Sequence, residues 1–243
     1  MAPNTPTYFK IDSTRHSATV ILIHGVGDSA RGMYATANLF HQDPAFKHVK
    51  WILPQAPIRP ITAHGNRNLR MPAWFDIFDF YNFQFQGTED EAGMFESMAS
   101  IEQLINQEIA LGIDPSRIVL AGFMQGGALA LLTGLTTQKK LAGLGILSGR
   151  LPMSRKIKEM APPHASSLPI FWGYNVADPL SKFAFNRASV RFLTEEMGIP
   201  IASATGDARG IEFHSYEGLG TGIGQEELGD LGLWLKKVLP THR

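Results

Sequence analysis

The stretch Ile118-Val119-Leu120-Ala121-Gly122-Phe123-Met124-Gln125-Gly126-Gly127-Ala128-Leu129-Ala130 decides the fold of this chain. Its first residues are an apolar run that predicts a buried strand, and its last residues favour a helix. Glycines at 122 and 126 frame the junction, and glycine permits tight turns and close backbone approaches. The stretch therefore predicts a strand, a glycine-framed turn at Met124, and a helix.

Apolar runs on both sides of this stretch predict further strands. Ala18-Thr19-Val20-Ile21-Leu22-Ile23 is rich in β-branched residues and shows no alternation with polar ones. This is typical of a parallel strand that is buried on both faces. The full set of expected strands is 18–23, 49–53, 116–121, 142–148, 168–173 and 211–216.

Helical patterns lie between the expected strands, up to about residue 41, after residue 88 and at 182–197. Thr88-Glu89-Asp90-Glu91 predicts a capping box, before a helix that ends at Gly112. Apolar residues recur at helical spacing in this helix and in the last one: Met94, Met98, Ile101, Ile105 and Ile109, then Leu228, Leu231, Leu235 and Val238. Such alternation predicts the α/β class, with a mostly parallel central sheet, helices on both faces and a single domain 1–243.

The composition is that of an ordinary globular protein, with 44% hydrophobic and 18% charged residues among 243. Lysine plus arginine and aspartate plus glutamate both number 22, so the zero net charge gives no support for a nucleic-acid partner. There is no cysteine, no pattern of a secretory leader and no apolar run of about 18 residues. We expect a cytoplasmic protein without a membrane span.

Neither a metal nor a cofactor is expected. The eight histidines show no metal-binding spacing. Gly25-Val26-Gly27-Asp28-Ser29-Ala30 fits the G-x-G-x-x-A pattern of dinucleotide sites. The next expected strand, however, leads into Pro54-Gln55-Ala56-Pro57, which offers no acid to hold a ribose.

Residues 74–87 interrupt the alternating pattern with seven aromatic side chains. Aromatic rings in a segment with weak helix signals predict a lid or wall over an apolar pocket. A packed satellite core uses the same residues, and an interface of a homodimer is a third reading. The rings are Trp74, Phe75, Phe78, Phe80, Tyr81, Phe83 and Phe85.

Seven motifs in order along the chain resemble those of the acyl-protein thioesterase/carboxylesterase family, which is also called lysophospholipase-like and has the α/β-hydrolase fold. The resemblance implies that fold over nearly the whole chain. The motifs are HGVGD at 24–28, PQAPIRP at 54–60, MPAWFD at 71–76, RIVLAGF and QGGAL at 117–123 and 125–129, LSGRLP at 147–152, ADPL at 177–180 and YEGLG at 216–220.

The resemblance also marks departures at the family's catalytic positions. Its G-x-S-x-G turn carries a nucleophilic serine, and the matching position here is Met124. Its histidine position is Thr221, and a His-Gly pair before the triad acid appears as Tyr174-Asn175. Asp178 matches the triad acid. A thioether and a threonine supply neither nucleophile nor base, so the resemblance implies no ordinary esterase or thioesterase activity.

Some of the family's machinery is still expected to work. The backbone N–H groups of Val26 and Gln125 match its oxyanion hole, which stabilises developing negative charge. Asp178 is either a working general acid or base, or a relic that is hydrogen-bonded to the backbone. Arg150 either binds a carboxylate or phenolate or is an ordinary surface arginine, and Tyr174 either bonds to the substrate or fills space.

Our sequence-based hypothesis is a repurposed enzyme that isomerises, cyclises or eliminates a small apolar or aromatic molecule. Its catalytic groups are Asp178, Tyr174 and Arg150, with Val26 and Gln125 as backbone donors. One alternative is an inactive protein that binds an acyl group, a small molecule or a protein partner, and another is residual hydrolysis through a different nucleophile. The expected substrate-binding residues are Met124, Thr221, Trp74, Phe75, Phe78, Asn175 and His24.

Overall fold

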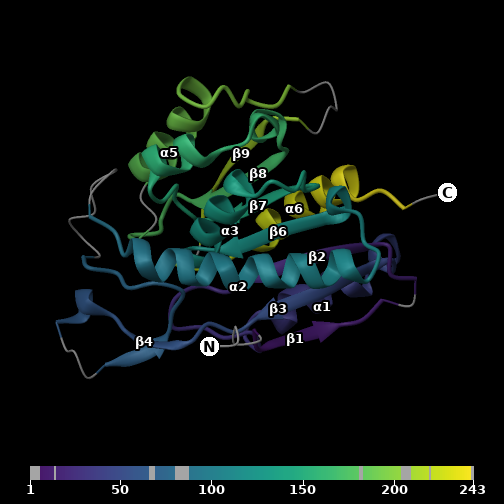
Figure 1. Ribbon diagram of the computed structural model, residues 1–243, viewed down its shortest axis with the longest axis horizontal. Helices are drawn as coiled ribbons and strands as arrows, with labels where there is room; N and C mark the ends of the chain where they lie inside the picture. Colours follow the sequence, from purple (N-terminus) through teal and green to yellow (C-terminus); the bar gives the residue numbers. More distant parts are fainter. Residues whose placement is uncertain are drawn as a thin grey trace.

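A seven-stranded sheet in the order β1-β3-β2-β6-β7-β8-β9 forms the centre of the computed structural model (Figure 1). The structure describes residues 6–13, 15–65, 69–79, 88–180, 183–203, 209–218 and 220–241. Only β1 is antiparallel to its neighbour, and the other pairs are parallel. The strands are β1 Tyr8–Ile11, β2 Ala18–Ile23, β3 Val49–Pro54, β6 Ile118–Phe123, β7 Gly143–Leu147, β8 Ile170–Asn175 and β9 Ile211–Tyr216.

Helices cover both faces of this sheet. Two helices, α1 and α6, contribute to the apolar core on one face, and α2, α3, α4 and α5 contribute to the core on the other. The predicted α/β-hydrolase architecture is therefore confirmed. The helices are α1 Tyr34–Gln42, α2 Glu91–Ala110, α3 Gln125–Thr136, α4 Ser154–Met160, α5 Phe183–Glu195 and α6 Gln225–Val238, with short 3-10 turns at Pro44–Phe46, Thr62–His64, Pro115–Arg117 and Pro163–Ser167.

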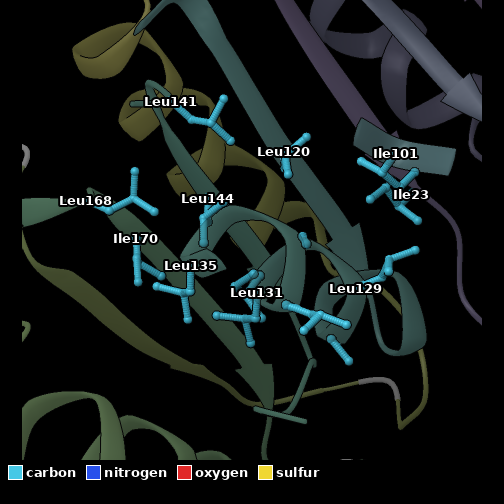
Figure 2. Packing of buried hydrophobic residues seen from close by; sticks show 14 of the residues in the cluster. Ile23, Ile101, Leu120, Leu129, Leu131, Leu135, Leu141, Leu144, Leu168 and Ile170 are labelled. Carbon is cyan, nitrogen blue, oxygen red and sulfur yellow. The ribbon is translucent and has the colours of Figure 1, made fainter. Parts of the chain in front are cut away.

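The helix α3 lies in the middle of the larger core. All of its residues are buried, which its almost wholly apolar sequence requires. Figure 2 shows Leu131 and Leu135 of α3 beside Leu144 of β7 and Ile170 of β8, all in one apolar cluster. Burial against several strands fixes the helix, and this fixes the turn that precedes it.

The apolar runs predicted the parallel strands, with boundaries that differ by one or two residues. The strand at 211–216 has the expected bounds. Short elements with weak patterns were not predicted: the edge strand β1, the helix α4, and a separate two-stranded sheet of β4 Ile58–Pro60 and β5 Arg70–Pro72. These elements are short, so each contains too few residues for a recognisable hydrophobic periodicity.

The predicted capping box at the start of α2 is wrong. Asp90 is the N-cap residue, and its carboxylate accepts a hydrogen bond from the backbone N–H of Gly93 at 3.0 Å. Glu91, the acid of the predicted box, is instead the first residue of the helix and forms an ion pair with Lys156. The tertiary partner therefore takes the acid that the local pattern assigns to the cap.

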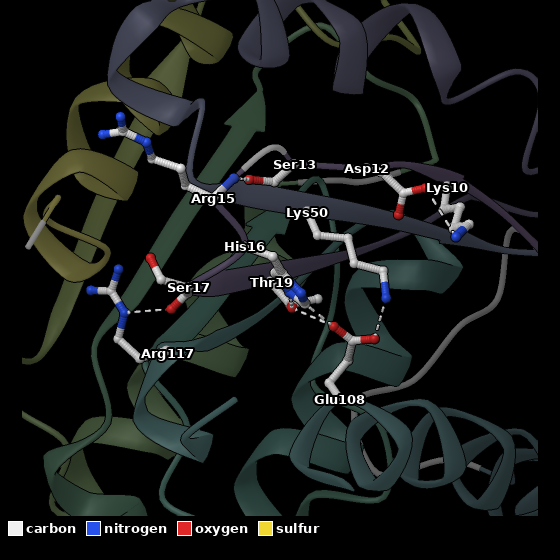
Figure 3. Close-up of polar contacts among 10 residues, drawn as sticks. All are labelled: Lys10, Asp12, Ser13, Arg15, His16, Ser17, Thr19, Lys50, Glu108 and Arg117. Carbon is white, nitrogen blue, oxygen red and sulfur yellow. Dashed lines mark hydrogen bonds and ion pairs between the residues drawn. The ribbon is translucent and has the colours of Figure 1, made fainter. Parts of the chain in front are cut away.

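The C-terminal end of α2 is tied to the sheet by a buried charged cluster (Figure 3). Glu108 is 2% exposed and accepts hydrogen bonds from the Lys50 ammonium at 2.5 Å and from the Thr19 hydroxyl at 2.7 Å. The ring Nε2 of His16 lies 3.2 Å from the same carboxylate. Burial lowers the pKa of His16 from its ordinary value, against the opposing effect of Glu108.

The aromatic segment divides into parts with different surroundings. Trp74 and Phe75 are each 2% exposed and belong to the main core, whereas Phe78 is 44% exposed. The later rings of the expected lid, at 80–87, lie outside the described residues. The single-domain assignment and the lid remain predictions. Among the described helices, none is long and apolar enough to cross a membrane.

Candidate active site

The turn between β6 and α3 holds Met124 in a strained conformation. Its φ of 49° and ψ of −107° are unusual for a residue with a Cβ, and such conformations cost about 1–3 kcal/mol. The Met124 N–H donates to the Leu147 carbonyl at 2.9 Å, and its carbonyl accepts from the Ala128 N–H at 3.0 Å. A sharp, strained strand-to-helix turn of this kind exposes a side chain above the sheet in α/β hydrolases.

Glycine is required on both sides of Met124 because the strand and helix backbones touch. A Cβ at Gly126 would lie 2.2 Å from the Ile23 carbonyl oxygen, and a Cβ at Gly122 would lie 2.3 Å from the carbonyl carbon of Gly126. Neither contact is sterically possible. The glycine frame thus lets α3 begin directly against β2 and β6, which places its N-terminus at the carboxyl ends of the strands.

The loop after β2 brings the backbone of Val26 to the same place. His24, which ends this strand, is fully buried; its Nδ1 lies 2.7 Å from the Gly25 carbonyl, and its Nε2 accepts from the Ala56 N–H at 3.1 Å. These partners fix a neutral ring with Nδ1 protonated, and burial lowers the pKa of His24. His24 therefore supports the loop rather than contacting a substrate.

Gln125 joins the turn to the start of the aromatic segment. Its side-chain oxygen accepts from the Trp74 N–H at 2.8 Å, and its amide nitrogen donates to the Phe75 carbonyl at 2.6 Å. The Trp74 indole N–H donates to the His24 carbonyl at 2.8 Å. Trp74 thus supports the turn from behind and lines a hollow of its own.

A pocket of about 100 Å³ opens above the turn. Its base comes from the β6–α3 junction, and its walls come from the segments after β5, β7 and β8 and from α5. Both expected oxyanion donors, Val26 and Gln125, contribute to it. The lining residues are Val26, Phe75, Ile77, Asp79, Met124, Gln125, Ala128, Ser148, Arg150, Leu180 and Phe185.

Arg150 brings a positive charge to this mostly apolar pocket. Its guanidinium forms an ion pair with the Glu89 carboxylate, whose second oxygen accepts from the Met153 N–H at 2.5 Å. The Glu89 side chain is only 6% exposed, so it is a fixed partner rather than a surface contact. Arg150 is therefore held in place at the pocket, and its binding of a substrate carboxylate or phenolate stays a prediction.

Asp178 and Thr221 lie together after the ends of β8 and β9. The Thr221 hydroxyl donates to Asp178 Oδ1 at 3.0 Å, and the Leu180 N–H donates to the same oxygen at 2.8 Å. Asp178 is 3% exposed. The acid therefore bonds both to the backbone and to the threonine, but neither residue lines the pocket itself.

Three expected substrate contacts lie outside the pocket. Tyr174 is 5% exposed and stacks between Phe183 and Phe213, so its ring is part of a packed aromatic group. Asn175 accepts from the Ala177 N–H at 3.1 Å, which is the space-filling turn role considered for it. Phe78 is largely exposed and does not line the pocket.

Several lining residues were missed by sequence reasoning. Ser148 follows the end of β7, and parallel strands bring their carboxyl ends to one edge, so its strand-end position was a usable signal. Leu180 and Phe185 carry no such signal. Among the residues that the structure describes, no group of three or more His, Asp or Glu side chains could hold a metal ion.

A buried acid lies beneath the loop that carries Thr221. Glu227, in the first turn of α6, is 1% exposed, and burial raises its pKa to about 7 although it accepts from the Gly224 N–H. Its Oε1 would lie 2.5 Å from a Cβ at Gly173 of β8, so glycine is required there. Glu227 thus wedges the start of α6 against β8.

The comparisons with known proteins agree with the motifs. The sequence profile of the Phospholipase/Carboxylesterase family matches residues 8–239. Acyl-protein thioesterase 1 of Cryptococcus neoformans var. neoformans serotype D is 40% identical over 240 residues, which cover 98% of this chain and 99% of that protein. Acyl-protein thioesterase 1 of Schizosaccharomyces pombe is 37% identical over 206 residues, 84% of this chain and 88% of the relative.

Solved structures show the same likeness. Arabidopsis thaliana SOBER1 superposes with a TM-score of 0.80 at 30% identity and covers 91% of this chain and 99% of its own. Acyl-protein thioesterase 2 of Zea mays gives a TM-score of 0.77 at 26% identity, with 96% and 99% covered.

These findings correct the functional hypothesis. Relatives named acyl-protein thioesterase at 35–40% identity over nearly the full length support hydrolase chemistry, so the expected isomerisation, cyclisation or elimination is wrong. An inactive binding protein finds no support in them either. With its profile match and its relatives spanning almost every residue, the chain belongs to the Phospholipase/Carboxylesterase family.

Proposed function

We propose that this chain hydrolyses acyl thioesters or carboxylic esters. The observation that carries the proposal is the strained turn at Met124, which begins α3 at an apolar pocket lined by Val26 and Gln125. This arrangement occurs in a chain that is 40% identical to an acyl-protein thioesterase over nearly its full length.

The substrate carbonyl oxygen would accept hydrogen bonds from the backbone N–H groups of Val26 and Gln125. Both belong to residues that line the pocket, and neither depends on a side chain at 124. Each preorganised donor of this kind contributes a factor of about 10²–10³ to the rate, because its hydrogen bond strengthens as negative charge develops on the oxygen in the transition state. The adjoining α3 N-terminus adds a favourable field for the oxyanion.

Hydrolysis here does not pass through the side chain of residue 124, since a thioether has no proton to lose and makes a poor nucleophile. We therefore propose that this member departs from the family's Ser-His-Asp mechanism. A water molecule between the pocket and the Thr221 hydroxyl forms the new C–O bond, and its proton passes through that hydroxyl to the Asp178 carboxylate. The C–S or C–O bond of the substrate then breaks, and the leaving thiolate or alkoxide takes that proton.

Thr221 would position this water, because its hydroxyl already bonds to Asp178 Oδ1 at 3.0 Å. A site of this kind lacks the serine and histidine that act as one unit in triad enzymes. Oxyanion binding alone retains a rate acceleration of about 10³–10⁴ over the uncatalysed reaction. We expect turnover of that order, well below the rate of a triad hydrolase.

The test is release of p-nitrophenol from its acetate and butyrate esters, and of free thiol from acetyl- and butyryl-CoA. Purified protein is first treated with a fluorophosphonate, which inactivates contaminating serine hydrolases. We expect turnover to survive this treatment, with no adduct at residue 124, and to fall at least tenfold in Asp178→Asn.

The matched control is Asp230→Asn, which removes a carboxylate that accepts a hydrogen bond from the Tyr216 hydroxyl at 2.8 Å. This variant should keep the activity. The proposal is overturned if turnover is no faster than in buffer for all four substrates. It is also overturned if Asp178→Asn and the unaltered chain turn over the substrates equally fast.

A further inference from the structure

The pocket at Met124 is small for an acyl-binding site. Its volume is about 100 Å³. An apolar cavity of roughly 150 Å³ holds one benzene molecule, and a water molecule occupies about 30 Å³ of liquid. By this measure the pocket holds about three or four carbon-sized groups.

Met124 itself takes part of the space at the base of this pocket. Both its backbone N–H and its carbonyl are hydrogen-bonded, and its positive φ fixes the direction of Cβ. The side chain lines the pocket beside the two oxyanion amides, where the start of an acyl chain would lie. A thioether-bearing side chain there leaves less room than the shorter side chain of the G-x-S-x-G pattern.

Phe185 of α5 and Leu180 of the preceding loop also line the pocket. Phe75 and Ile77 line the pocket as well. The hollows lined by Trp74, by Ser154 and by Phe192 share no lining residue with this pocket, so none of these hollows extends it. A long alkyl chain therefore has no continuation from the pocket into these hollows.

We infer that the pocket selects short acyl groups, of about two to four carbons, and that Met124 and Phe185 set this limit. The inference rests on the proposed hydrolase function, for which it names the substrate class. It concerns binding, so it is testable without turnover.

The probes are unreactive straight-chain methyl ketones from 2-propanone to 2-dodecanone, whose carbonyl is offered to the same amides. Their dissociation constants are measured by titration calorimetry. Each buried methylene is expected to tighten binding about fourfold. In the unaltered chain this gain should continue for about four carbons and then stop or reverse.

Two variants enlarge the pocket from opposite ends, Met124→Gly and Phe185→Ala. Glycine tolerates the positive φ at 124, so the turn keeps its conformation. In each variant the ketone that binds most tightly should be longer by about two or three carbons than in the unaltered chain. Phe183→Ala is the matched control, since Phe183 lies two residues earlier on α5, is 46% exposed and does not line the pocket.

The inference is overturned if the affinity of the unaltered chain keeps rising to 2-dodecanone, or if Phe185→Ala and Phe183→Ala give the same profile. Circular dichroism of each variant shows that the fold is intact before binding is compared. A short-chain binding profile without any ester turnover would leave the inference standing and refute the proposed hydrolysis. Turnover that is fastest for long-chain esters would support the proposed hydrolysis and refute the inference.

Discussion

Met124 and Thr221 are the two side chains that determine what chemistry this site performs. Met124 lies at the strained turn, and Thr221 places its hydroxyl 3.0 Å from the buried Asp178. A serine at 124 and a histidine at 221 would supply a nucleophile and a base on the same scaffold. The geometry therefore favours recovery of nucleophilic catalysis by substitution at these positions alone.

We predict that the double variant Met124→Ser/Thr221→His raises kcat/KM for p-nitrophenyl butyrate at least 100-fold over the unaltered chain. The reason is that a hydroxyl, a ring base and Asp178 would form one unit, and the loss of such a unit costs up to about 10⁶ in kcat. Steady-state kinetics and fluorophosphonate labelling check this.

The single variants serve as controls, because neither half of the unit suffices. Met124→Ser alone should gain less than about tenfold and should label slowly. A double variant that folds but neither labels nor gains activity would show that the three positions do not align.

At the scale of elements, the junction of α6 with β8 depends on a buried acid. Glu227 fits where Gly173 has no side chain, and it also accepts from Gly224 at the start of the helix. Because Thr221 lies in the loop directly before this helix, the same contact supports the candidate site. The junction should respond to pH, since burial favours the neutral acid.

We predict that Glu227 makes the folded state less stable as the pH rises from about 4.5 to about 7. Its pKa is 4.5 in its ordinary state and about 7 when buried, so only the unfolded chain loses the proton in this window. The contribution is fully present below the lower value and lost above the higher one, and it amounts to about 3 kcal/mol. Thermal unfolding at pH 5 and 7.5 measures it.

Glu227→Gln should lose this pH dependence, because the amide does not titrate. Glu226→Gln, in the same helical turn but with its side chain exposed, should keep it. Parallel dependences of Tm on pH for the unaltered chain and Glu227→Gln would contradict the assignment.

At the scale of the whole molecule, a buried ion pair fastens α2 to the sheet at the end opposite the pocket. Lys50 of β3 is 6% exposed and Glu108 of α2 is 2% exposed, and only the fold brings them together. Removing one charge of a buried pair leaves the other uncompensated, whereas removing both leaves an apolar contact.

We predict that Lys50→Met lowers the free energy of unfolding by about 3–5 kcal/mol. The double variant Lys50→Met/Glu108→Leu should recover at least half of this loss. Urea unfolding of the two variants measures both values. Equal destabilisation by the single and double variants would show that the pair is not the source of the effect.

The sequence by itself determined the class of the fold and the place of its central turn. Unbroken apolar runs such as 18–23 have one stable location, a parallel sheet covered on both faces, and the glycines around Met124 fit only a close contact of strand and helix. The positions of Val26, Gln125 and Arg150 in the pocket also followed from strand ends and motifs.

Only the tertiary structure decided how the pocket is closed and which polar groups meet. Phe185 and Ile77 come from segments far apart in the sequence, and no local pattern marks their shared space. The same holds for Glu91, which a capping pattern assigns to the start of its own helix and which the fold pairs with Lys156 of α4. Periodicity reports which face of an element is buried, whereas packing between elements chooses the partners that it is buried against.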